Sequence, residues 1–147
     1  MKSRWIPAVA VLIPLALAGC SSSNKPGSAK AAYITQSDVV CKDVFAKATA
    51  IGNGKDQATA QKQADLWQEA NNRLKKLPMP GESVEQARQF VTDTENLSLA
   101  YTAAANSIAA GFQPKADTYF GQAAQTKKDA AKVAKEYGFS ECSAING

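Results

Sequence analysis

Apolar residues recur every three or four positions in four long stretches of the chain, and glycine or proline residues separate these stretches. This spacing places apolar side chains on one face of an α-helix. The pattern predicts helices at about residues 37–51, 56–77, 84–110 and 114–137. No segment alternates apolar and polar residues over a useful length, as a half-buried strand would. We therefore predict an all-α fold.

The predicted helices carry apolar stripes rich in alanine, which favours close packing with little internal volume. The stripes comprise Val40, Val44, Phe45, Ala48 and Ile51; Ala60, Ala64, Trp67, Ala70, Leu74 and Leu77; Ala87, Phe90, Thr94, Leu97, Tyr101, Ala104 and Ile108; and Phe120, Ala123, Ala130, Val133, Ala134 and Tyr137. Short connections favour antiparallel neighbours. We expect an up-and-down antiparallel helical bundle of four helices, in which the first and last helices can be neighbours.

Two helix ends carry recognisable capping residues. Ser83 with Gln86 fits a capping box at the start of the third helix. Gly138 suits a left-handed C-cap after the fourth helix, and Phe139 can then fold back over the last turn.

Residues 1–19 have the layout of a secretory signal peptide. Lys2 and Arg4 precede an apolar run at residues 5–18, which spans roughly 21 Å as a helix and falls short of the ~30 Å bilayer core. This length argues against an uncleaved membrane helix. The other alternative is an ordinary signal peptide followed by a chance cysteine.

The leader ends in Leu17-Ala18-Gly19-Cys20, which resembles the lipobox of bacterial lipoproteins. Small residues before the cysteine let a peptidase approach the backbone, and the Cys20 thiol can form a thioether with a diacylglycerol donor. One acyl chain binds a membrane reversibly, whereas two or three, such as added palmitate, bind durably. The resemblance implies cleavage before Cys20 and a lipid anchor on the extracytoplasmic face of the cell membrane.

Residues 20–34 are expected to form the lipidated N-terminus and a flexible tether. Residues 21–32 are rich in Ser, Gly, Pro and Lys and show no apolar period. The helical bundle domain is then expected at residues 35–147, with Thr35 or Ser37 capping its first helix.

Processing changes the composition. Removal of 19 of the 147 residues leaves 128, enough for one domain with one core. Loss of Lys2 and Arg4 lowers the basic residues from 17 to 15 against 13 acidic ones, so the net charge falls from +4 to +2. A balance this close to neutral implies no nucleic-acid partner.

Two cysteines remain if Cys20 carries lipid. In an oxidising compartment, the simplest expectation is that Cys41 and Cys142 form a disulfide, which would join the first helix to the C-terminal tail. The alternative is a pair of reactive thiols, although neither cysteine lies in a Cys-x-x-Cys motif or beside a histidine.

Several segments together resemble the small helical lipoproteins of unassigned function that are common in actinobacteria. These segments are the lipobox, the sequence Ser-Asp-Val-Val-Cys-Lys at residues 37–42, Leu-Pro-Met-Pro at residues 77–80, and the Gly-Phe-Ser-Glu-Cys ending at residues 138–142. The resemblance implies a bundle, a disulfide bridge and a place in the cell envelope. It implies no activity, so only Cys20 and the cysteine pair take a role from it.

The chain contains no histidine. This excludes Ser-His-Asp and Cys-His catalysis, histidine-bound zinc and Glu-x-x-His di-iron sites. Asp65 and Glu69 lie four residues apart on one predicted helix, while Asp93 and Glu95 lie two apart and face different directions. Such acids are usually solvated, so we expect no enzyme and name no catalytic, cofactor-binding or metal-binding residue.

Lys128, Lys132 and Lys135 share one face of the fourth predicted helix, with Lys127 nearby. A basic strip can rest on anionic lipid or wall polymer, but the interleaved Asp129 favours a solvated face.

These observations favour a non-catalytic envelope lipoprotein that acts through its surface on a protein or wall component. The alternative is a carrier for a lipid or another apolar molecule, in a cavity lined by Trp67, Phe90, Tyr101 and Phe120. Core packing is the competing explanation for Trp67 and Tyr101.

Overall fold

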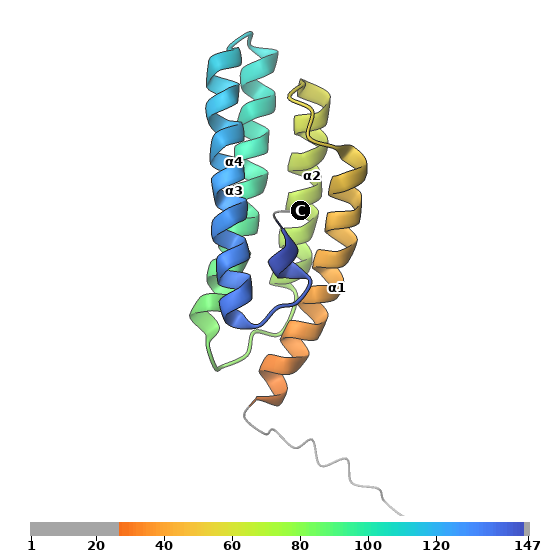
Figure 1. The fold of residues 1–147 in the computed structure, drawn as a ribbon, viewed down its shortest axis with the longest axis vertical. Coiled ribbons are helices and arrows are strands. Elements are labelled where there is room, and N and C mark those ends of the chain that lie inside the picture. The colour runs from red at the N-terminus through yellow and green to blue at the C-terminus, as the bar shows by residue number, and fades with distance from the viewer. Residues whose placement is uncertain (1–26, 146–147) are drawn as a thin grey trace, which may run out of the picture.

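A computed structural model describes residues 27–145, and these residues form four α-helices and one short 3₁₀ turn (Figure 1). The elements are α1 (Ser28–Ile51), α2 (Gln57–Lys75), α3 (Val84–Ala109), α4 (Gln113–Tyr137) and η1 (Cys142–Ala144). The four helices run alternately up and down, which confirms the predicted antiparallel bundle. None of the helices in this part of the chain is long and apolar enough to span a membrane.

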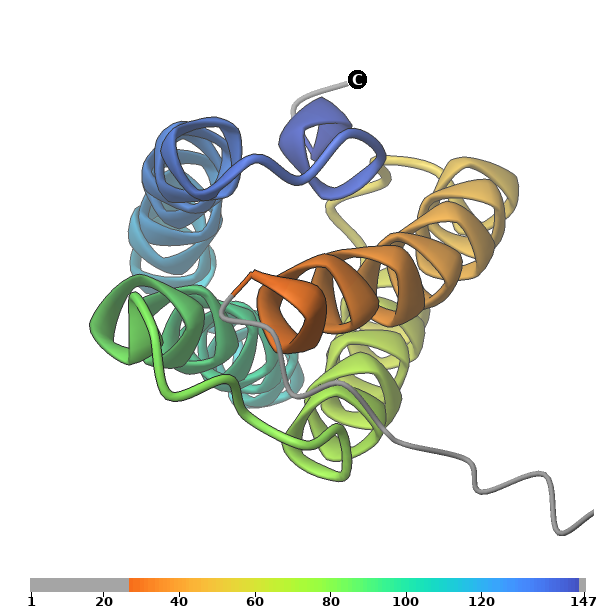
Figure 2. The same ribbon diagram turned by 90° about the horizontal axis from the view of Figure 1, so that it is seen from below.

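The bundle is open between its first and last helices. Successive helices pack against each other, but no Cα atom of α1 lies within 8 Å of one in α4. The turn η1 instead contacts both helices and lies between them, as the view along the bundle shows (Figure 2). The C-terminal tail therefore fills space between the two backbones, which meet through side chains such as Tyr33 and Tyr137.

The predicted apolar stripes face the core. On α2, for example, Ala60, Ala64, Trp67, Ala70 and Leu74 are all buried. The main core extends through all four helices and continues into the tail at Phe139, Cys142 and Ile145.

The first helix starts earlier than the sequence predicted. It begins at Ser28 and includes residues 28–34, so their assignment to a flexible tether is wrong. Tyr33 is only 1% exposed and its ring packs 6.1 Å from that of Tyr137 and 6.0 Å from that of Phe139. Ser37 consequently lies buried inside the helix and does not cap it. The remainder of the predicted tether, residues 20–26, lies outside the described residues.

The expected capping box at Ser83 is also wrong. Ser83 has a φ of 53°, and its side chain makes no capping hydrogen bond. A serine caps from an extended backbone, and the left-handed conformation directs its hydroxyl elsewhere. On α2, the carboxylate of Asp56 does cap, accepting a hydrogen bond of 2.9 Å from the backbone N–H of Thr59.

The predicted C-cap of α4 is confirmed. Gly138 has a φ of 103°, which only glycine adopts readily. The N–H groups of Gly138 and Phe139 donate to the carbonyls of Lys135 and Ala134, the pair of bonds that defines a Schellman motif. Phe139 folds back as expected, with its ring 4.7 Å from Tyr137 and 5.1 Å from Phe90.

Asp38 and the predicted disulfide hold the tail on α1. Cys41 and Cys142 are bonded across a sequence separation of 101 residues. One turn earlier on α1, the carboxylate of Asp38 accepts hydrogen bonds of 2.7 to 3.0 Å from the Ser140 hydroxyl and from the backbone N–H groups of Ser140, Glu141 and Cys142. A single side chain thus caps the start of the terminal turn.

We expect Asp38→Ala to lower the free energy of unfolding by about 2 kcal/mol, near the upper end for loss of a charged cap. Urea unfolding of the oxidised protein measures this loss. Asp65→Ala is the matched control, because Asp65 is exposed and accepts one hydrogen bond, from Gln61. Equal stability of the two variants would contradict a structural role for Asp38.

Candidate functional site

Two adjoining hollows lie on the open side of the bundle, beside the connection between α1 and α2. They have volumes of about 390 Å³ and about 280 Å³. Both are lined by Gly52, Asn53 and Lys127, so Lys127 of α4 stands between them. We call the two hollows together the open-face groove. It exists because η1 fills only part of the space between α1 and α4.

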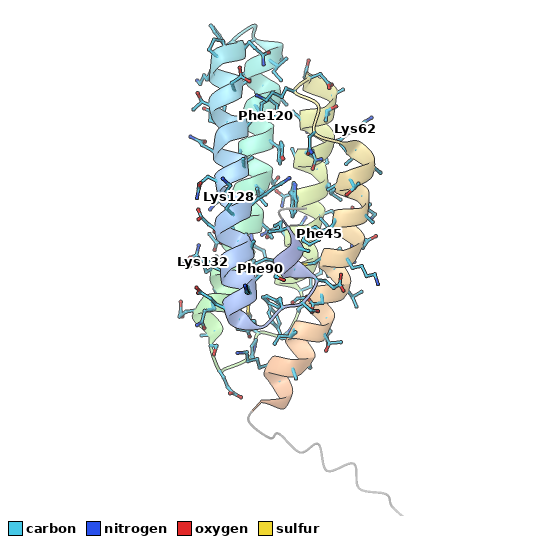
Figure 3. The ribbon with its side chains drawn as sticks, viewed as in Figure 1. Phe45, Lys62, Phe90, Phe120, Lys128 and Lys132 are labelled. Atoms are coloured by element: carbon cyan, nitrogen blue, oxygen red, sulfur yellow. A yellow bond between two sulfur atoms is a disulfide. The ribbon has the colours of Figure 1, made fainter. Side chains whose placement is uncertain are left out.

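Each of the four helices contributes an aromatic ring to this groove: Phe45, Trp67, Tyr101 and Phe120. Phe45 and Trp67 line the first hollow with their ring centroids 6.2 Å apart, and Tyr101 and Phe120 line the second, also 6.2 Å apart. Trp67 is 2% exposed and forms part of the core, while the other three rings are partly exposed. Figure 3 shows Phe45 and Phe120 on different helices along the groove side of the bundle.

Lysines surround these rings. The ammonium group of Lys127 lies 5.8 Å from the ring centroids of both Trp67 and Tyr101, within range of a cation–π interaction. Lys55 lies 5.8 Å from Phe120 and pairs with Asp117 at 3.0 Å. Lys42 lines the first hollow.

The charge of the groove is positive. Glu141 is the one carboxylate that lines either hollow within residues 27–145. In the same part of the chain, neither Lys42 nor Lys127 has a carboxylate within 4.0 Å. The cations at the groove therefore exceed the anions.

Two buried polar atoms of groove-lining residues have no hydrogen-bond partner among the described residues. They are Nε1 of Trp67 and Oε1 of Gln63. The amide nitrogen of Gln63 is satisfied, because it donates to the carbonyls of Ala48 at 3.2 Å and Gly52 at 2.9 Å. Buried polar atoms are rarely left unpaired, but unpaired ones also occur away from the groove, on Tyr33, Ser37, Asn71, Asp93 and Tyr137, so these two atoms do not by themselves mark a site.

The structure brings together three of the four rings named in the carrier hypothesis. Trp67, Tyr101 and Phe120 line the groove, and Trp67 is at the same time part of the core. The fourth ring does not line the groove: Phe90 is 0% exposed and packs on Phe139 in the core. The tail covers Phe90, and the helical period cannot reveal that contact.

Lys127 differs from the other lysines of α4 in a way that the sequence analysis does not predict. Lys128, Lys132 and Lys135 are exposed, and Figure 3 shows Lys128 and Lys132 on the outer side of α4. Lys127 is half-buried and faces the aromatic rings. The missed signal is its spacing of seven residues from Phe120, which puts both on one helical face.

The acidic residues form no group that could hold a metal ion within the described part of the chain. Asp65 and Glu69 are exposed, and Glu69 joins a surface network with Lys47 and Arg73. Asp93 and Glu95 face different directions as expected: Glu95 pairs with Lys75 of α2, and Asp93 is buried.

Asp93 is a buried carboxylate outside the groove. It is 5% exposed, and it accepts a hydrogen bond of 2.8 Å from the Gln89 side chain on Oδ1, while Oδ2 has no partner among the described residues. Burial raises the pKa of Asp93, the Gln89 hydrogen bond opposes this, and the nearby charge of Asp129 raises it further.

Comparisons with known proteins were made at the level of families, sequences and structures. No family model matches the chain, and neither the curated proteins nor the solved structures give a match.

We expect Asp93→Asn to raise the free energy of unfolding by about 1 kcal/mol at neutral pH, because the amide carries no charge to bury. The raised pKa means that the folded state binds a proton more readily than the unfolded state. Wild-type stability should therefore fall as pH rises from the ordinary carboxyl pKa of about 4 through the raised folded value.

Urea unfolding of both proteins across this pH range measures the difference. The advantage of Asp93→Asn should disappear at acidic pH, where both states of the wild type are protonated. Asp65→Asn, at an exposed position on α2, is the control. A gain for Asp93→Asn that is equally large in acid would show that burial of charge is not its cause.

Proposed function

We propose that this chain is a non-catalytic, membrane-anchored lipoprotein of the cell envelope that works by binding, with the open-face groove as its binding site. The proposed anchor is a lipid on Cys20, after removal of residues 1–19 as a signal peptide. The anchor proposal is based on the resemblance of Leu17-Ala18-Gly19-Cys20 to a lipobox.

One observation carries the binding role: four aromatic rings from four helices line the groove beside Lys42 and Lys127, which have no carboxylate partner among residues 27–145. Burying the apolar lining of the groove under further contacts between α1 and α4 would stabilise the fold, so an open groove is not what stability alone would favour. Hollows with an apolar lining and a few converging polar groups are typical of ligand sites. A chain without histidine, and without a metal-holding group of acids among residues 27–145, supports the proposal of a role without catalysis.

Two kinds of occupant are compatible with this site. A protein or wall component could lie across the groove and pair with its lysines, as the leading sequence hypothesis holds. The volumes of about 390 Å³ and about 280 Å³ and the recessed rings favour the second hypothesis, a carrier of a lipid or another small apolar molecule.

The proposed anchor predicts that Cys20→Ala abolishes lipidation and moves the protein out of the membrane fraction, since the thioether cannot form. Cell fractionation and intact mass measure both effects. Cys41→Ala should remain in the membrane fraction, because Cys41 is bonded to Cys142 in the bundle. A Cys20→Ala protein that stays in the membrane after losing its leader would refute the anchor.

The proposed binding site can be tested in living cells with a photoreactive amino acid at Asn53, which is exposed and lines both hollows. We expect light to produce an adduct of defined mass. The same amino acid at Asn72, which is exposed on α2 away from the groove, is the control. Equal labelling at both positions, or none at Asn53, would contradict binding in the groove.

A further inference from the structure

We propose that the open-face groove binds a single-chain amphiphile with one negative charge, its hydrocarbon against the aromatic rings and its acidic head at Lys127. This inference rests on the proposed function, in which the groove is a binding site, and it names the class of ligand.

Lys127 is the expected contact for the acidic head. The Lys127 side chain is half-buried, its ammonium group lies 5.8 Å from the centroids of two aromatic rings, and no carboxylate of residues 27–145 lies within 4.0 Å of it. An acidic head bound beside apolar rings is attracted to a cation more strongly than one at an open surface, because solvent screens the attraction less. Lys127 also lies between the two hollows, so the head of a ligand in either one can reach it.

The remaining charges limit the ligand to a single negative charge. Lys42 adds a second positive charge to the first hollow, and Glu141 on the tail adds a negative one. Lys55 is already paired with Asp117. A polyanion would place its further charges near these carboxylates, whereas one acidic group can pair with Lys127 alone.

The rings provide the surface for the hydrocarbon. Phe45, Tyr101 and Phe120 are partly exposed, although burying aromatic carbon is favourable by roughly 25 cal/mol per Å². An acyl chain covers such a surface without placing polar atoms beside it.

Ligands of other charge fit less well. A cation meets the ammonium of Lys127, which already interacts with the Trp67 and Tyr101 rings. A neutral lipid leaves Lys127 half-buried without an anion. Positive charge together with an apolar lining therefore selects an anionic amphiphile.

Trp67 provides a direct readout. The chain has two tryptophans, Trp5 and Trp67, and the proposed processing removes Trp5. The lipoprotein should be purified from membranes, checked by intact mass and placed in nanodiscs of zwitterionic lipid. A permanently charged bromoalkyl sulfonate is then titrated, because bromine quenches indole fluorescence on contact. A bromoalkyl trimethylammonium of equal chain length is the matched cation.

We expect saturable quenching by the sulfonate and roughly tenfold weaker binding of the ammonium probe. Lys127→Gln should weaken sulfonate binding roughly tenfold, while Lys127→Arg should restore most of it. Lys132→Gln, which removes an exposed lysine from the outer face of α4, should change affinity by less than about twofold. Unchanged circular dichroism and melting would show that the variants are folded.

Three outcomes would overturn this inference: equal affinity for both probes, equal losses in Lys127→Gln and Lys132→Gln, or no saturable quenching. The photoadduct at Asn53 separates this inference from the proposed function. If the adduct forms while the sulfonate fails to bind, the groove is a binding site for another class of ligand. If both fail, the proposed function is wrong as well.

Discussion

The attachment of the C-terminal tail to α1 is the constraint on which the shape of this bundle depends. No Cα atoms of α1 and α4 lie within 8 Å of each other, although Tyr33 packs on Tyr137, so an unfilled channel would separate the two backbones without the tail. Asp38 orients the start of η1, the disulfide to Cys41 fixes its distance from α1, and Phe139 and Ile145 fill the space beneath it. The closing element is short, however, and it covers only one part of the channel. The open-face groove is the remainder, so the same attachment that completes the core also sets the boundary of the candidate site.

The sequence predicted the elements whose physical causes are local. The apolar stripes, the breaks at Gly and Pro and the Gly138 cap depend on residues within a turn or two of one another. The start of α1 was missed because residues 28–34 have little apolar periodicity of their own. They are helical because Tyr33 packs against Tyr137 and Phe139, more than 100 positions later in the chain. The role of Asp38 could not be predicted for the same reason, since its hydrogen-bond partners lie in the tail.

The candidate site could be predicted only in part. Helical spacing placed Trp67, Tyr101 and Phe120 on inward faces, but it could not distinguish a ring inside the core from one at its edge. A ring lies at the edge of the core where two helices are too far apart to cover it, and the spacing of the helices is a property of the whole bundle. Lys127 shows most clearly what the sequence cannot predict. In the sequence it is one of several lysines that suggest a solvated strip on α4, and only its position near the Trp67 ring distinguishes it from Lys128.

The early start of α1 bears on how the domain is held at a membrane. With the lipid on Cys20, as proposed, only seven residues would separate the anchored position from the start of the helix, and α1 itself is 24 residues long, roughly 36 Å. The groove lies toward the far end of that helix, around Phe45 and Gly52. The height of the groove above the bilayer would then depend largely on the length of α1, so a ligand leaving the lipid phase would have to travel along the bundle to reach it.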